Sequence, residues 1–165
     1  MSKRQPTRSF VSYIDRSREY YVAQGYSQPY AWAHHQDVPF APLPKPLSQC
    51  RVGLVTTAGR EDIEGASQGR NREFYAMSAD PAPSGIYTAH LFWDKKATHT
   101  DDLGSFLPLN RLAEVAAEGR IGSVSPRFYG APTDYSQGRT VNVVAPQILE
   151  WCRQDGVDAV LLSGL

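Results

Sequence analysis

Apolar side chains recur along this chain at a helical spacing of three and four residues in three segments, 8–24, 107–119 and 140–155. Gly25 is placed to end the first of these helices. Pro108 suits the first turn of the second helix, where a missing N–H costs nothing. Pro146 falls inside the third segment and predicts either a kink or a helix that starts near residues 144–145.

Apolar residues at consecutive rather than alternating positions predict a strand at 51–59, and an apolar run after Gly156 predicts another at 157–162. Aromatic and β-branched residues predict a strand at 86–93, and a short strand is possible at 74–77. A strand that is apolar at successive positions is covered on both faces, as in a parallel sheet. Gly156 separates the last helix from the last strand, which gives half of a βαβ crossover. The pattern therefore predicts an α/β fold with a partial doubly wound, mainly parallel sheet and flanking helices.

Other segments carry weaker patterns. Residues 121–125 are too short for more than a strand stub or turn. Residues 127–130 follow this turn and end in a flexible Gly/Pro loop, and residues 60–84 are expected mainly as a surface excursion. Four prolines between residues 39 and 46 exclude a helix there and favour an extended arm. We expect an N-terminal helix and proline-rich arm at 1–47 and an α/β domain at 48–165, forming one globular unit overall.

Composition narrows the function classes. The chain has 165 residues, 41% hydrophobic and 21% charged, with 17 basic and 17 acidic side chains. Basic and acidic residues balance, which argues against duplex nucleic acid as a main partner. No apolar run approaches the ~20 residues needed to cross a bilayer. The N-terminus lacks the apolar region of a signal peptide. Cys50 and Cys152 have no zinc-site spacing. We expect a reduced, cytoplasmic protein.

The carboxyl end of the 51–59 strand is the first candidate site. Thr56, Thr57 and Gly59 place small and hydroxyl-bearing residues where open α/β sheets bind ligands. No dinucleotide-binding glycine motif follows the strand. Arg127 could bind a substrate carboxylate bidentately, although a surface ion pair explains it equally well.

Histidines and carboxylates form the second candidate site. His90, Asp94 and His99 are followed by Asp101 and Asp102. Such groups can bind a metal or transfer protons. Their spacing matches no metal motif, so a solvated loop is favoured over a metal site, and contact with a substrate or partner is weighed equally with that loop. Both cysteines are interpreted as small packed apolar residues.

The segments taken together resemble the selenoprotein B family, which comprises the large subunits of glycine, sarcosine and betaine reductases and the corresponding D-proline reductase subunit. The resemblance runs from about residue 38 to the end of the chain. It is carried in order by 39–47, 51–59, His90 with Asp94, His99 with Asp101 and Asp102, 107–112, 118–122, 126–129 and 155–162.

The resemblance implies an oxidoreductase subunit that cleaves a C–N bond reductively, with a dithiol/disulfide couple. In the family, a selenocysteine or cysteine follows the last strand, and its anion attacks an amine or amino-acid substrate held as an iminium on a partner's pyruvoyl group. This chain would carry no cofactor of its own. Its partners would be a pyruvoyl-bearing subunit and a small-molecule substrate, within a homo- or hetero-oligomer. His90, Asp94 and His99 are candidate catalytic residues, and Thr56, Thr57, Gly59 and Arg127 are candidate substrate-binding residues.

The family's redox residue would follow Leu165, and we expect an in-frame UGA codon there. Two alternatives stay open, a non-catalytic scaffold subunit and a His/Asp metal-binding protein. If no element covers the final strand, its aliphatic side chains should cause self-association.

Overall fold

The computed structural model describes residues 13–28, 33–38, 41–60, 73–86, 88, 99–131 and 136–164. The chain divides into two compact units, Met1–Pro39 and Phe40–Leu165. The domain boundary that the sequence predicts after residue 47 stays a prediction, as does the extended proline-rich arm. Within the described residues, no helix combines the length and the apolar character needed to span a membrane.

The first unit contains helix α1 (Tyr13–Ala23), which confirms the helix predicted in this segment. Gly25 follows it with a φ of +84°, a left-handed conformation that glycine adopts without steric cost. The ring of Tyr21 meets those of Tyr20 and Tyr26 edge to face. These aromatic contacts are local to the helix and the turn after it.

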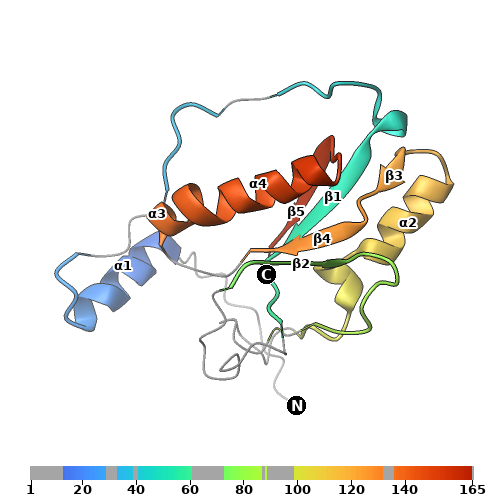
Figure 1. Cartoon of the computed structure of the whole chain (residues 1–165). Helices are drawn as coiled ribbons and strands as arrows, with labels where there is room; N and C mark the ends of the chain where they lie inside the picture. Colours follow the sequence, from blue (N-terminus) through green and yellow to red (C-terminus); the bar gives the residue numbers. More distant parts are fainter. Residues whose placement is uncertain are drawn as a thin grey trace, which may run out of the picture. The chain divides into compact units, whose positions relative to one another are not determined.

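The second unit is built around a mainly parallel sheet (Figure 1). Strand β1 is central and pairs in parallel with β3, β4 and β5, whereas β2 pairs antiparallel with β4. The strands are β1 (Arg51–Thr56), β2 (Tyr75–Ser78), β3 (Ser123–Val124), β4 (Arg127–Gly130) and β5 (Ala159–Ser163). This sheet with its flanking helices confirms the α/β class, and the doubly wound arrangement stays a prediction.

Helices cover both faces of the sheet (Figure 1). On one face, α2 (Leu109–Ala117) contributes Leu109 to a buried cluster with Leu54 and Phe128. On the other face, Val55 and Tyr129 pack against the segment formed by α3 (Gln137–Arg139), the π-helical turn η4 (Thr140–Val144) and α4 (Ala145–Gln154). Neighbouring residues of β1 and β4 thus enter opposite cores, as the alternation of side chains along a strand requires.

The helix around Pro146 is continuous but irregular. Helical structure extends from Gln137 to Gln154, and Ala145 alone separates the π turn η4 from the proline. Because proline lacks the N–H for an ordinary intrahelical bond, wider helical winding before it is a local accommodation. Gly156 then ends α4 with a φ of +63° and leads into β5, as the sequence predicts.

One strand is not predicted from the sequence. Residues 127–130, for which the pattern indicates neither a helix nor a strand, form β4, and Phe128 and Tyr129 are completely buried. Short 3₁₀ turns, η1 (Leu47–Gln49) and η3 (Leu103–Ser105), precede β1 and α2. The strand predicted at 86–93 lies almost entirely outside the described residues.

Candidate functional site

Three parallel strands end at the same edge of the sheet. Thr56, the last residue of β1, is the register partner of Gly130 in β4 and of Ser163 in β5. The carboxyl ends of parallel strands form the usual ligand-binding edge of an open α/β sheet. Two hydroxyl side chains and a glycine therefore share the candidate edge, although only Thr56 was singled out from the sequence.

The predicted residues after β1 remain together at this edge. Thr56 is 0% exposed, and its Oγ1 accepts a hydrogen bond from the N–H of Ala58 at 3.3 Å. The carbonyl of Thr56 accepts another from the N–H of Ala131 at 2.9 Å. Thr57 is half-buried and Gly59 is buried. The chain beyond β1 is thus held in a fixed path, and the ligand-binding role of these three residues stays a prediction.

Tyr75 and Arg60 belong to the same edge and were not identified from the sequence. The hydroxyl of Tyr75 donates a 2.7 Å hydrogen bond to the carbonyl of Ala58. Burial raises the pKa of Tyr75 well above its usual value, so the phenol is neutral. The Arg60 guanidinium carbon lies 5.9 Å from the centre of the Tyr75 ring. Arg60 directly follows Gly59 in the sequence, and this position could have placed it at the predicted site.

Gly130 lets the Tyr75 ring occupy this position. A Cβ atom on Gly130 would lie 2.0 Å from the ring, far inside van der Waals contact. The glycine is therefore required by close packing rather than by its backbone conformation.

Arg127 lies at the opposite end of β4 from Gly130. Its Nε is 2.8 Å from Oδ2 of Asp155 and its Nη2 is 2.9 Å from Oδ1, which makes a bidentate ion pair. The carboxylate that Arg127 binds in this structure is thus the protein's own. The structure does not bring Arg127 together with the threonines, and its substrate-binding role stays a prediction.

A buried polar network surrounds this ion pair. The hydroxyl of Tyr129 donates to Oδ2 of Asp155 at 2.6 Å and lies 3.1 Å from Oγ of Ser125. Burial alone would raise the pKa of Asp155, but the hydrogen bonds from Arg127 and Tyr129 outweigh it and lower that pKa below its ordinary value. Burial, followed by the hydrogen bond to Asp155, raises the pKa of Tyr129. The network therefore holds an ionised carboxylate against a neutral phenol.

The histidine and carboxylate cluster is only partly described. His90 and Asp94 lie outside the described residues. His99 is 71% exposed, and its Nδ1 accepts a 3.3 Å hydrogen bond from the N–H of Asp101. Asp102 accepts from the N–H of Gly104 at 2.9 Å. Among the described ranges, no three His, Cys, Asp or Glu side chains gather into a metal-binding group.

Both cysteines are buried and unpaired by disulfides. The thiol of Cys50 donates to the carbonyl of Lys45 at 3.4 Å. Burial raises the pKa of the Cys152 thiol. A redox nucleophile needs an accessible thiol with a lowered pKa, so neither cysteine fits the redox residue that the family resemblance implies.

The comparisons with known proteins address the chain as a whole. A family model described as glycine/sarcosine/betaine reductase selenoprotein B matches residues 21–164. A glycine reductase complex component B subunit gamma from Symbiobacterium thermophilum is 26% identical over 145 residues, covering 84% of this chain and 34% of that protein. A betaine reductase complex component B subunit beta from Peptoclostridium acidaminophilum is 28% identical over 130 residues, covering 74% and 29%.

These relatives are components of reductase complexes, and this chain spans about a third of their length. No solved structure matches significantly. The family match extends across the described sheet and both of its helical layers. The chain belongs to the glycine/sarcosine/betaine reductase selenoprotein B family.

Proposed function

We propose that this chain acts within a reductase complex that cleaves a C–N bond of an amine or amino acid. The electrons come from a dithiol, which is oxidised to a disulfide. The nitrogen takes up a proton and leaves as an amine or ammonia, except in cyclic D-proline, where it stays attached through its second C–N bond as a primary amine. Membership of the family and the reductase-complex names of its relatives support this reaction class. The assay described below compares glycine, sarcosine, betaine and D-proline as substrates.

The observation that carries the proposal is the shared carboxyl edge of β1, β4 and β5. Thr56 and Ser163 are register partners there, and Thr57, Gly59 and Arg60 follow directly after β1. Small side chains leave room for a small substrate, hydroxyl groups hydrogen-bond it, and the positive charge of Arg60 favours a carboxylate. We assign substrate binding and orientation to this edge.

The proposed reaction needs two chemical groups that neither Cys50 nor Cys152 supplies. A redox-active selenocysteine or cysteine would deliver the electrons, and a pyruvoyl-bearing partner subunit would hold the substrate nitrogen. Because Cys50 and Cys152 are buried, no redox step is assigned to them. The proposal therefore concerns binding by this chain and assembly with a partner.

The test is reconstitution of the full chain with a pyruvoyl-bearing reductase subunit. With and without dithiothreitol, the assay measures release of ammonia or an amine from glycine, sarcosine and betaine, and cleavage of the ring C–N bond of D-proline, which releases its nitrogen as a new primary amine. The expected result is dithiol-dependent release that falls at least several-fold in Thr57→Val, while the exposed Thr140→Val control retains it. Assembly without release for any substrate would contradict the reductase function and favour the scaffold alternative.

The metal-binding alternative is tested on the same preparation. Stoichiometric zinc or iron that disappears in a His90→Ala, His99→Ala double variant would favour it. Metal content that is unchanged by the double variant would reject it. In the described part of this cluster His99 is exposed, and no three His, Cys, Asp or Glu side chains lie close enough together to bind one metal ion. The described geometry therefore does not favour this alternative.

A further inference from the structure

Within the described residues, strand β3 pairs with another strand along one edge only. The N–H of Ser123 donates to the carbonyl of Cys50 at 3.3 Å, and the N–H of Ser125 donates to that of Val52 at 2.9 Å. Because successive residues of a strand direct their backbone groups to opposite sides, the N–H and C=O of Val124 face away from β1. Within the part of the chain that the structure describes, neither group has a hydrogen-bond partner.

The neighbouring strand leaves the sheet just before it would cover this edge. Strand β2 pairs with β4 as far as Ser78, opposite Arg127. One further bond joins the N–H of Ala79 to the carbonyl of Pro126 at 2.9 Å. From Asp80 onward, no described residue continues that ladder along β3. The ladder of β2 therefore stops beside Val124, and none of the residues that the structure describes pairs with that side of Val124.

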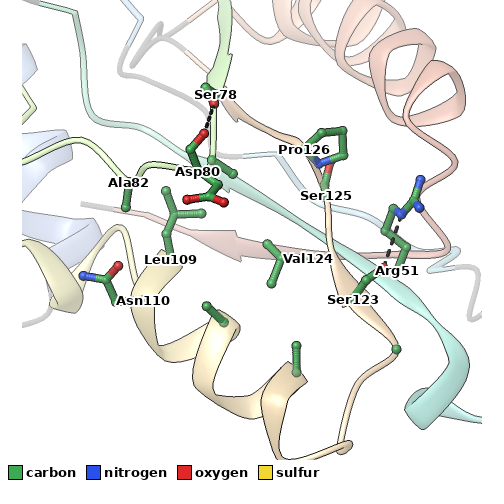
Figure 2. A pocket seen from close by; sticks show the side chains of 14 residues that line it. Arg51, Ser78, Asp80, Ala82, Leu109, Asn110, Ser123, Val124, Ser125 and Pro126 are labelled. Carbon is green, nitrogen blue, oxygen red and sulfur yellow. Dashed lines mark hydrogen bonds between the residues drawn. The ribbon is translucent and has the colours of Figure 1, made fainter.

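A groove of about 740 Å³ lies alongside this open edge, between β3 and α2 (Figure 2). On the helix side it is lined by Ala113 and Ala116, and Ala79 and Ala82 lie on the side of the departing chain. Small side chains leave space beside a strand edge for another backbone and its side chains. The groove thus combines free backbone hydrogen-bonding groups with room for an extended segment.

The two ends of the groove differ in charge. Asp80 and Asn110 lie at one end, and Arg51 and Ser123 lie at the other (Figure 2). Arg51 is occupied, because its guanidinium donates to the carbonyl of Asp155 and to Oγ of Ser123. The Asp80 carboxylate has no ion pair or hydrogen bond within the described residues. A cation on the ligand would complement it.

We propose that this groove binds an extended, positively charged peptide segment of a partner chain. The segment adds to the sheet by pairing its backbone with Val124 and places a Lys or Arg side chain against Asp80. Backbone pairing gives the affinity and the charge contact gives the preference for a basic residue. This surface lies on strand β3 and helix α2, so the inference is independent of the substrate edge assigned above.

The test is a titration of the ¹⁵N-labelled full chain with two blocked peptides, acetyl-Thr-Val-Lys-Val-Thr-amide and its counterpart with Glu in place of Lys. The Lys peptide is expected to shift the Val124 amide resonance and slow its hydrogen exchange. Asp80 attracts the Lys side chain and repels the Glu side chain, so the Lys peptide should bind about tenfold more tightly than the Glu peptide at low salt. The difference should shrink as salt screens the charges.

A charge swap makes the outcome specific. Asp80→Lys should reverse the preference, so that the Glu peptide binds more tightly, whereas Asp101→Lys, a charge reversal at an exposed position outside the groove, should leave it unchanged. Val124→Pro removes the free N–H and should abolish binding; if that variant does not fold, the Asp80 swap alone decides. An unperturbed Val124, equal binding of both peptides, or a dimer that protects Val124 without peptide would overturn the proposal.

Discussion

The hydroxyl of Tyr129 and the carboxylate of Asp155 are joined by a 2.6 Å hydrogen bond that ties strand β4 to the end of α4. Arg127 binds the same carboxylate through two nitrogens. Arg51 of β1 donates to the main-chain carbonyl of Asp155 at 2.5 Å. One residue therefore connects both central strands to the turn that leads into β5, and hence fixes how β5 enters the sheet.

Asp155→Ala is expected to lower the free energy of unfolding by about 2–4 kcal/mol, because it leaves the Arg127 cation and the Tyr129 hydroxyl without their shared partner. Urea denaturation followed by circular dichroism measures the change. Asp101→Ala, at an exposed carboxylate, is the matched control and should change stability by no more than about 0.5 kcal/mol. Equal stability of the two variants would mean that the network contributes nothing.

The same carboxylate predicts acid sensitivity. The pKa of Asp155 in the folded chain is below its ordinary value of 3.8, through the hydrogen bonds from Arg127 and Tyr129. A lowered folded-state pKa contributes stability that is fully present above the ordinary pKa and is lost as pH falls through the folded value. Unfolding free energy should therefore fall below about pH 4, and less steeply in Asp155→Asn. A steeper acid loss in the variant than in the native chain would contradict this sign.

Asp158 adds a second contribution in the same direction. The hydrogen bond from Lys45, followed by that from the N–H of Arg51, lowers the pKa of Asp158. The unfolding free energy of Asp155→Asn should therefore still fall at acid pH. In the Asp155→Asn, Asp158→Asn double variant this fall should be smaller again. This residual slope is an internal check that the effect belongs to these two carboxylates.

Gly130→Ala tests the packing at the candidate edge. The new methyl group would lie 2.0 Å from the buried Tyr75 ring, whose hydroxyl is already fixed to Ala58. Overpacking of this kind costs about 1–3 kcal/mol. Gly138→Ala is the control, because nothing lies within 4 Å of its added Cβ and alanine favours its helix. In a Tyr75→Ala background the cost of Gly130→Ala should largely vanish, and an undiminished cost would show that the ring is not its cause.

The elements that the sequence predicts correctly are those with local signals. β1, α2 and β5 each carry an apolar run or a helical spacing of their own. β4 has only four residues after Pro126, and their burial depends on flanking strands that are distant in the sequence. Four residues that follow Pro126 and end in the turn-forming Gly130 cannot be identified as a strand until the neighbouring strands are known.

The candidate site divides in the same way. Thr56, Thr57 and Gly59 follow one another, so a single predicted strand places all three at its carboxyl end. Ser163 joins them only through the register of β1 with β5, and Tyr75 only through β2. The pairing of Arg127 with Asp155 also depends on tertiary structure, so the sequence alone supports a substrate carboxylate and a surface ion pair equally well.

Strand β5 predicts how the isolated chain behaves in solution. Val160, Leu161 and Leu162 are exposed, with Leu162 at 76%, and within the described residues β5 pairs only with β1. An exposed apolar strand edge recruits further strands, whereas a lysine on such an edge opposes pairing. The chain should therefore self-associate with rising concentration, and Leu162→Lys should shift its light-scattering mass toward the 18.3 kDa monomer. Val141→Lys, which replaces an exposed aliphatic residue outside β5, should leave the association unchanged. A native chain that stays monomeric at its solubility limit would refute the prediction.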